Sequence, residues 1–232
     1  MKEMKSSGGL VEKGAAFFES RGWEPFPFQV NAWQHFEEKG DALINAPTGS
    51  GKTYSALVPA VLGGGESGGL RVLWITPIRA LAKEIQGSAS RLIEWQDKGW
   101  SVGVRTGDTP ASEKQKQDKR MPEVLITTPE SLHVLLAKKG AAKRFGGLKA
   151  MVVDEWHDLL GSKRGVQIEL ALSQLKALAP DLRIWGISAT IGNLEEAKES
   201  LMGTDRSSNA QVIRSDLAKK ISVNSLMPEA FE

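Results

Sequence analysis

Cysteine is absent from this chain of 232 residues. Its absence excludes a disulfide framework, a thiolate zinc site and a thiol nucleophile, although it fits any cellular compartment. Long apolar runs are missing too. None approaches the roughly 20 residues that span a bilayer, and residues 1–9 lack the apolar segment of a secretory signal. We therefore expect no membrane association and a cytoplasmic location.

Net charge is also low, at +2, so overall electrostatics do not indicate a nucleic-acid partner. Residues 113–120 and 138–144 nevertheless form two basic runs. Such runs are either solvated helix faces, which is the commoner case, or phosphate contacts, and charge alone does not decide between them. Hydrophobic residues at 41% and charged residues at 25% are typical of a globular domain with a large core.

Short apolar runs alternate with helical patterns along the chain. Several of these runs are continuously apolar, which is typical of strands buried on both faces of a parallel sheet. We predict strands at residues 42–45, 71–75, 101–105, 124–127, 150–153, 183–187 and 211–214. We predict helices near residues 27–39, 54–62, 79–95, 111–119, 131–138, 166–178 and 194–201. The alternation predicts a doubly wound, mostly parallel α/β sheet with helices on both faces, which binds ligands at the carboxyl ends of its strands.

Residues 46–53 read Ala-Pro-Thr-Gly-Ser-Gly-Lys-Thr and follow an apolar strand. This is the strand–loop–helix context of a phosphate-binding loop, although Ala46 replaces its usual first glycine. Glycines let backbone N–H groups converge on phosphates, Lys52 is placed to reach the β- and γ-phosphates, and Thr53 offers a hydroxyl to Mg²⁺. A glycine-rich turn that matches by chance is the alternative. The nucleotide-binding residues expected here are Thr48, Gly49, Ser50, Gly51, Lys52 and Thr53.

A second motif, Asp154-Glu155-Trp156-His157, follows the apolar strand at residues 150–153. We expect Asp154 to hold Mg²⁺ opposite the phosphate loop and Glu155 to act as the base for the attacking water. The alternative is an aspartate that caps a helix with a glutamate in its first turn. His157 is either a buried, satisfied histidine or a link between nucleotide state and neighbouring motifs.

Five motifs in order resemble those of the first RecA-like domain of superfamily 2 DExH-box helicases, and the resemblance covers essentially the whole of that domain. Asp154-Glu155-Trp156-His157 resembles motif II, and Ser188-Ala189-Thr190 resembles motif III. Residues 76–81 and 127–132 resemble motifs Ia and Ib. Residues 107–113 and 160–165 are similar to the large-helicase-related (Lhr) group, and residues 154–165 to its bacterial branch of ligase-associated helicases.

The resemblance implies further roles. Gln29 would read the adenine edge, and Phe26 or Trp23 would stack on the base; an exposed helix-capping glutamine is the alternative for Gln29. Ser188 and Thr190 would couple motif II to nucleotide state, where a helix-capping turn is the alternative. ATP and Mg²⁺ are the cofactors expected.

Nucleic-acid contacts are expected where strands give way to helices, because helix N-termini offer N–H groups to phosphates. The tryptophans at positions 100, 156 and 185 are base-stacking candidates, although core positions are commoner for such residues. For Lys163 and Arg164, a solvated loop is the alternative. The strand-contacting residues expected are Thr76, Arg79, Thr128, Ser131, Lys163 and Arg164.

We expect a flexible tail at residues 1–9, one RecA-like domain at residues 10–218, and at residues 219–232 the start of a linker to a second RecA-like domain. That domain would supply an arginine finger. The function expected is the motor domain of an ATP-dependent DNA or RNA helicase or translocase in DNA repair. Its partners would be single-stranded or partly duplex DNA, with RNA as an option, and a DNA ligase or nuclease. The alternatives are a nucleotide- and strand-binding module without catalysis, and a protein-remodelling ATPase.

Overall fold

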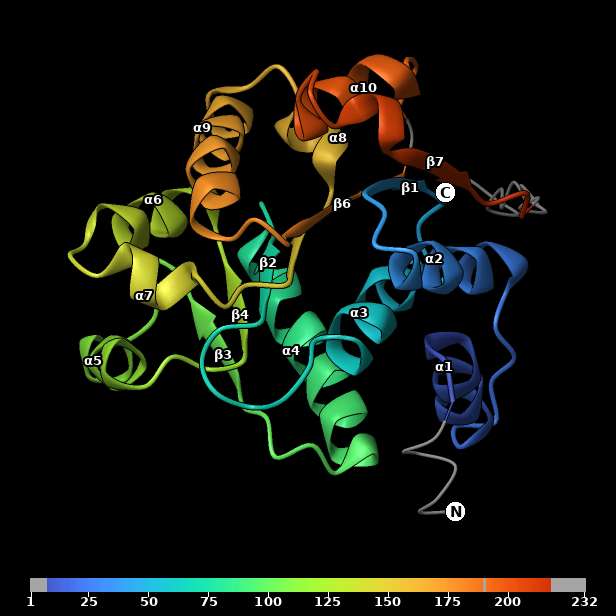
Figure 1. Cartoon of the computed structure of the whole chain (residues 1–232), viewed down its shortest axis with the longest axis horizontal. Helices are drawn as coiled ribbons and strands as arrows, with labels where there is room; N and C mark the ends of the chain where they lie inside the picture. Colours follow the sequence, from blue (N-terminus) through green and yellow to red (C-terminus); the bar gives the residue numbers. More distant parts are fainter. Residues whose placement is uncertain (1–7, 190, 218–232) are drawn as a thin grey trace, which may run out of the picture.

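The computed structural model describes residues 8–189 and 191–217 and contains one seven-stranded sheet (Figure 1). Every paired strand runs parallel to its neighbour, in the order β3-β4-β2-β5-β6-β1-β7. The strands are β1 (Ala42–Asn45), β2 (Val72–Ile75), β3 (Val102–Arg105), β4 (Val124–Thr127), β5 (Ala150–Val153), β6 (Arg183–Ser188) and β7 (Gln211–Arg214). The doubly wound α/β prediction is confirmed, and each predicted strand is present to within one residue.

Alternate residues of each strand enter different cores, because successive side chains point to opposite faces of a sheet. In β1, Ile44 belongs to one core cluster and Leu43 to the other. In β2, Trp74 and Leu73 divide in the same way. The inner strands are buried on both faces, which explains why their sequences are continuously apolar.

Two helical layers cover the sheet (Figure 1). The first layer supplies the core cluster that contains Ile44, and its helices are α1 (Leu10–Glu19), α2 (Pro27–Glu37), α3 (Lys52–Leu62) and α4 (Arg79–Gln96). The second layer packs around Leu43, and its helices are α6 (Pro129–Ala137), α7 (Ala141–Phe145), α8 (Trp156–Leu159), α9 (Lys163–Leu178) and α10 (Leu194–Met202). Helix α5 (Ala111–Lys119) lies against the edge strand β3, where Gln117 donates to the Val104 carbonyl.

Three predicted helices begin earlier than expected, because their caps lie outside the apolar pattern. Gly51, in the left-handed region, precedes α3, so the helix starts at Lys52. The hydroxyls of Thr128 and Ser162 accept hydrogen bonds from the first turns of α6 and α9. Lys163 therefore opens α9, and the solvated-loop alternative for it is wrong.

The sequence prediction missed α1, α7 and α8, together with a short 3-10 turn at Ser207–Asn209. Of the predicted tail, residues 1–7 lie outside the described part, and Gly9 is the N-cap of α1. The predicted linker at residues 219–232 lies wholly outside it. Within residues 8–189 and 191–217, no helix combines the length and apolarity that crossing a bilayer requires.

Helix α1 contacts α2 so closely that one glycine has no room for a side chain. A Cβ on Gly14 would lie 2.6 Å from the ring of Trp33, which is fully buried. We therefore expect Gly14→Ala to lower the free energy of unfolding by about 1–3 kcal/mol, through overpacking. The matched control is Gly87→Ala in α4, where the nearest atom is 3.5 Å away. Better helix propensity should leave this variant unchanged or stabilise it by up to about 1 kcal/mol. Urea denaturation measures the free energy of unfolding of both variants. A Gly14→Ala variant more stable than the wild type would contradict the close contact between Gly14 and Trp33.

Candidate functional site

Three neighbouring strands bring the motifs of the candidate site together. In the register of the sheet, Asn45 of β1 pairs with Ser188 of β6, and Gly186 of β6 pairs with Val153 of β5. The phosphate loop follows β1, the Asp154 motif follows β5, and Ser188 ends β6. Because all three strands are parallel, the segments that follow them open at the same edge of the sheet.

The phosphate loop has the backbone that its sequence predicts. Gly49 and Gly51 have φ of 82° and 76°, a left-handed conformation that favours glycine. The hydroxyl of Ser50 is buried and has no hydrogen-bond partner among the described residues. Thr48 is exposed, and Thr53 is half-buried in the first turn of α3. The loop therefore presents an unsatisfied hydroxyl at the start of a helix, where anions are favoured.

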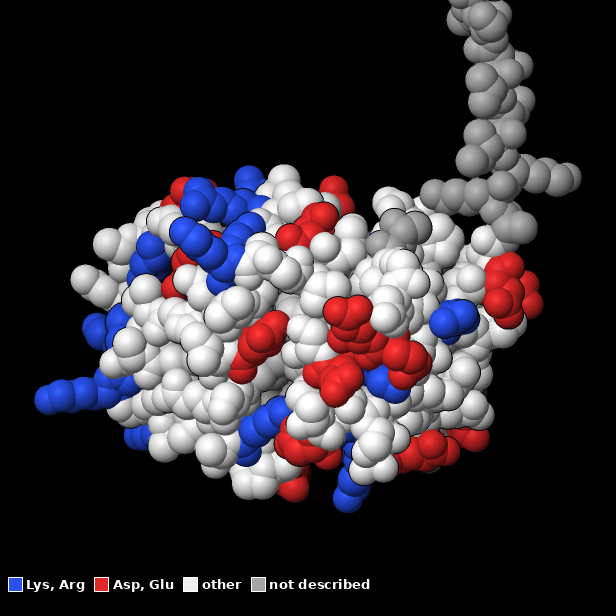
Figure 2. All heavy atoms as spheres, turned by 90° about the horizontal axis from the view of Figure 1, so that it is seen from above, with Lys and Arg blue, Asp and Glu red and all other residues white. Residues whose placement is uncertain are grey.

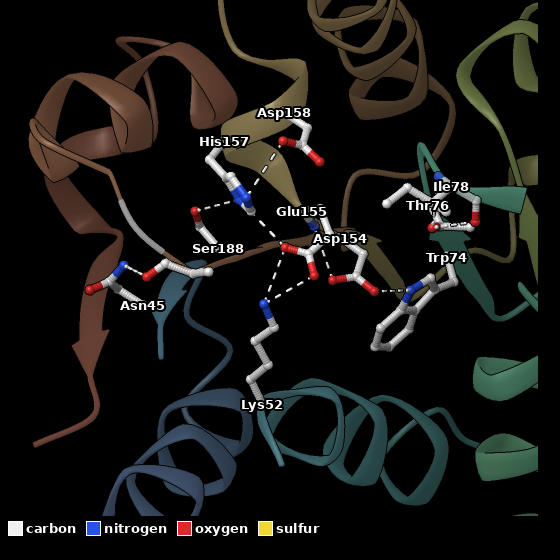
Figure 3. A network of polar contacts seen from close by, with 11 residues as sticks. Asn45, Lys52, Trp74, Thr76, Ile78, Asp154, Glu155, His157, Asp158 and Ser188 are labelled. Carbon is white, nitrogen blue, oxygen red and sulfur yellow. Dashed lines mark hydrogen bonds and ion pairs between the residues drawn. The ribbon is translucent and has the colours of Figure 1, made fainter. Parts of the chain in front are cut away.

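The lysine of this loop meets the second carboxylate of the Asp154 motif (Figure 3). The Nζ atom of Lys52 lies 3.1 Å from both carboxylate oxygens of Glu155. Their side chains are 8% and 15% exposed, so water screens the pair little. Glu155 has a φ of 49°, which is unusual for a residue with a side chain and stores backbone strain at this point.

Asp154 is buried immediately beside this pair. Burial, and secondarily the charge of Glu155, raise its pKa to about 6. One carboxylate oxygen accepts a hydrogen bond from the indole of Trp74 at 3.3 Å, and the other from the backbone N–H of Glu155 at 3.0 Å. The N-cap of α8 is Glu155, without a side-chain cap, so the helix-capping alternative for Asp154 is wrong.

His157 connects this carboxylate pair to β6 (Figure 3). Its Nδ1 lies 3.1 Å from the hydroxyl of Ser188 and 3.5 Å from a carboxylate oxygen of Glu155. The side-chain amide of Asn45 donates to the Ala189 carbonyl at 2.8 Å, which ties the strand before the phosphate loop to the end of β6. Thr190, the other predicted coupling residue, lies outside the described residues.

An aromatic pocket of about 400 Å³ adjoins the phosphate loop. Trp23, Phe26 and Tyr54 line it, so it contains both rings that were expected to stack on a base. Gln29 also lines it but is only 2% exposed, so the exposure expected in the alternative is wrong, whereas its helix-capping role is confirmed, because Gln29 caps the backbone at the start of α2. Its side-chain oxygen accepts from the N–H of Phe26, and its amide donates to the Gly51 carbonyl, both at 2.9 Å. The glutamine thereby links the pocket to the loop.

These residues fit a nucleoside triphosphate and Mg²⁺. The buried, unpartnered hydroxyl of Ser50 is a donor that phosphate oxygens can satisfy. The raised pKa of Asp154 marks a carboxylate without sufficient compensating positive charge. Mg²⁺ keeps several waters and binds one or two carboxylates together with phosphates, so one carboxylate, Asp154, and the Thr53 hydroxyl are oxygen donors of the kind that it takes.

The candidates after β2 divide into one buried and one exposed side chain. Thr76 is fully buried, and its hydroxyl both donates to and accepts from the backbone of Ile78. It therefore shapes the turn into α4. Arg79, the first residue of α4, is exposed and forms an ion pair with Asp108 at 2.8 Å. Of the two, Arg79 is the side chain that a ligand can reach.

The candidates after β4 join α6 to α9. Thr128 is buried as the N-cap of α6, and its hydroxyl lies 3.2 Å from that of the half-buried Ser131. Arg164 pairs with Glu130 at 2.7 Å, which connects the first turns of the two helices. Lys163 is exposed at the start of α9. These residues lie together, and Lys163 has no ion pair among the described residues.

The structure also decides between the two readings of the tryptophans and adds residues. Trp100, Trp156 and Trp185 are at most 6% exposed, so the commoner reading, a core position, is confirmed and base stacking by them is wrong. Trp74 and Asn45 were missed as site residues. Neither carries a motif signal, because their roles arise only when β2 lies beside β5 and β1 lies beside β6.

The raised pKa of Asp154 predicts a pH dependence of stability. The folded state binds the proton more tightly than the unfolded state, whose pKa is near 3.8. This contribution is therefore full at low pH and is lost as pH rises through about 6. Relative to Asp154→Asn, we expect the wild type to lose about 2 kcal/mol of unfolding free energy from pH about 4 to about 7, without Mg²⁺. Trp74→Phe should raise the folded-state pKa of Asp154 further, because it removes a hydrogen-bond donor to the carboxylate, and should thereby extend the pH range over which stability is lost. Urea denaturation measures the difference, and a pH-independent difference would contradict the assignment.

Two known proteins that are similar to this chain are both Lhr helicases. The Lhr helicase/uracil glycosylase of Escherichia coli (strain K12) is 34% identical in an alignment 205 residues long, which covers 79% of this chain and 13% of that protein. The ATP-dependent helicase Lhr-Core of Methanocaldococcus jannaschii is 33% identical in an alignment 237 residues long including gaps, which covers 94% of this chain and 28% of that protein. The chain thus spans less than a third of the length of these relatives. The predicted resemblance to the Lhr group is confirmed.

Among solved structures, that of the Mycobacterium smegmatis helicase Lhr bound to ssDNA and AMP-PNP is similar, with a TM-score of 0.79 and 31% identity. The match covers 91% of this chain and 28% of that one. The DEAD-box helicase Mss116 bound to ssRNA and UDP-BeF, at 20% identity and a TM-score of 0.75, shows the same fold. The family described as DEAD/DEAH box helicase matches residues 26–197. The chain therefore belongs to the DEAD/DEAH box helicase family.

Proposed function

We propose that this chain is the first ATP-binding motor domain of a nucleic-acid helicase or translocase. The observation that carries the proposal is the buried meeting of Lys52 with Glu155, directly beside the raised-pKa carboxyl of Asp154. A lysine on a phosphate loop after β1 and two carboxylates after β5, two strands away at the same edge, are the groups that phosphoryl transfer to water requires. The family supports ATP as the nucleotide.

Each residue has a proposed task. The loop from Thr48 to Thr53 holds the phosphates, and the pocket of Trp23, Phe26 and Gln29 holds the adenine. Mg²⁺, bound through Thr53 and Asp154, would neutralise charge on the phosphates.

A bound phosphate would contact Lys52 in place of Glu155. The carboxylate of Glu155 would then be free to orient and deprotonate the attacking water. His157, in contact with both Glu155 and Ser188, reports that change to β6. Thr190 is proposed to take part in the same relay.

The proposed strand contacts lie on the β2 and β4 side of the same edge. Arg79, Ser131, Lys163 and Arg164 offer side chains to a phosphate backbone, while the buried Thr76 and Thr128 fix the turns that present them. Relatives of known structure were solved with ssDNA, DNA or ssRNA. We propose single-stranded or partly duplex DNA as the ligand, with RNA as the alternative.

The remaining parts of the function extend beyond this chain. We propose that a second RecA-like domain closes over the ATP and supplies an arginine finger, since related NTPases gain orders of magnitude in rate from that group. The chain alone would then bind nucleotide weakly and hydrolyse it slowly. A binding module without catalysis is the second candidate. A DNA-repair role, ligase or nuclease partners, the ligase-associated branch and a cytoplasmic location stay predictions.

Glu155→Gln separates nucleotide binding from hydrolysis. We expect the complete protein to hydrolyse ATP with strong stimulation by single-stranded DNA. Glu155→Gln should lower that turnover by about 10²–10⁴-fold, because the base is lost, while nucleotide binding persists. Lys52→Ala should weaken both. The measurements are steady-state phosphate release and binding of a fluorescent ATP analogue.

The matched control is Glu84→Gln, which removes an exposed carboxylate on α4 and should leave turnover unchanged. Full turnover by Glu155→Gln would overturn its role as the base. Hydrolysis that responds to neither DNA nor RNA would overturn the nucleic-acid function and leave only the ATPase.

A further inference from the structure

The two basic runs that the proposed function does not use come together in the fold. A pocket of about 400 Å³ lies between the end of α5 and the segment that joins α6 to α7. Its positively charged lining comes from both runs: Lys119, Arg120, Lys139, Lys143 and Arg144. We call these five residues the basic pocket. About twenty residues of sequence separate the two groups, so the fold alone creates this concentration of charge.

The basic pocket has no carboxylate available to neutralise it. Asp118 is the only acidic residue that lines it within the described chain. That carboxylate is already paired, with Lys138 at 2.7 Å and with the buried Arg105 at 2.9 Å. None of the five cations forms an ion pair with a described residue. Four of them are exposed, and the fifth, Arg144, is half-buried and donates to the Leu135 carbonyl. The charge is therefore free to act on a ligand.

The basic pocket is distinct from the candidate ATP site. Its lining residues Leu70, Arg120 and Met121 precede β2 and β4, so it lies at the amino ends of the strands. The phosphate loop and Asp154 follow the carboxyl ends. Figure 2 shows Lys and Arg gathered toward the left end of the face drawn, the end where Figure 1 places α5, α6 and α7. Asp and Glu gather nearer the middle (Figure 2).

Phosphate groups are the anions that this lining suits best. Leu70 and Met121 are the only large apolar residues that line it in the described chain, and no aromatic ring does. Protein interfaces depend on buried aromatic or aliphatic anchors, whereas a sugar–phosphate backbone is held mainly by lysine, arginine and backbone groups.

Helix α5 connects this pocket to the proposed strand contacts. It starts after β3, near the carboxyl edge where Arg79 pairs with Asp108, and ends at Lys119 in the basic pocket. Nine helical residues rise by about 14 Å. That distance corresponds to about four base pairs along a duplex. A nucleic acid that extends past the strand contacts by a few nucleotides is therefore long enough to reach the basic pocket.

We propose that the basic pocket is a second nucleic-acid site, which binds the backbone phosphates of the part of the substrate that lies outside the motor's strand path. The identity of the polyanion rests on the proposed function. The duplex arm of a partly unwound substrate fits the site, because contacts there read phosphates without regard to sequence. This site holds the substrate and takes no part in ATP hydrolysis.

The test removes three charges and measures the salt dependence of binding. The variant Lys119→Gln/Lys139→Gln/Lys143→Gln spares Arg144, whose hydrogen bond to Leu135 is structural. The control Lys13→Gln/Arg21→Gln/Lys39→Gln removes the same charge from the α1 and α2 end of the molecule. Fluorescence anisotropy with the full 232-residue chain compares a strand of about eight nucleotides with the same strand joined to a duplex of about 20 base pairs. Thermal unfolding checks that both variants are folded.

We expect the pocket variant to bind the duplex-bearing substrate about tenfold or more weakly than the wild type. The slope of log affinity against log salt concentration should be less steep by about 2–3, since each lost phosphate contact removes about 0.9 from it. The short strand should bind as in the wild type, and the control should match the wild type on both. Equal slopes for pocket variant and wild type would overturn the second site alone. A loss confined to binding of a polyglutamate peptide would assign the pocket to a protein partner instead. No salt-dependent binding of any nucleic acid by the wild type would overturn the proposed function as well.

Discussion

The parallel pairing of β5, β6 and β1 is the constraint on which the candidate site depends. Since these neighbours run in one direction, the segments that follow them open at one edge, and each needs to carry only one or two functional side chains. Beyond β5, strands β2 and β4 continue the same edge. The proposed nucleotide-binding residues and the proposed strand contacts therefore occupy adjoining halves of one surface, with Asp154 and its partner Trp74 at the junction.

Much of this architecture was predictable because buried parallel strands are written as continuous apolar runs, and all seven were located to within one residue. The helices that were missed lack such a signal. Helix α1 follows Gly9, which has no side chain with which to cap a helix. Helix α8 has four residues, too few to show a helical period, and it starts from the left-handed Glu155.

The sequence predicted which site residues lie at strand ends, but it did not predict which of them contact one another. In a parallel sheet, residues that follow strands share an edge whatever the strand order. To predict a side-chain contact between two strands, the order of the strands in the sheet must be known. Trp74 reaches Asp154 only because β2 lies beside β5, and Asn45 reaches Ala189 only because β1 lies beside β6. For the same reason, the sequence presented the basic runs as two separate helix faces, since their meeting depends on how α5 and α7 pack.

The Lys52–Glu155 ion pair joins the two helical layers of the domain. Lys52 opens α3, which belongs to the layer of α1 to α4. Glu155 precedes α8, whose Trp156 is buried in the opposite layer and donates to the Ala197 carbonyl of α10. The pair is thus anchored on both sides of the sheet. Any shift of one layer against the other at this point would therefore change the distance between Lys52 and Glu155. A contact on α10, which accepts the hydrogen bond of Trp156, would act on the pair without reaching the phosphate loop itself.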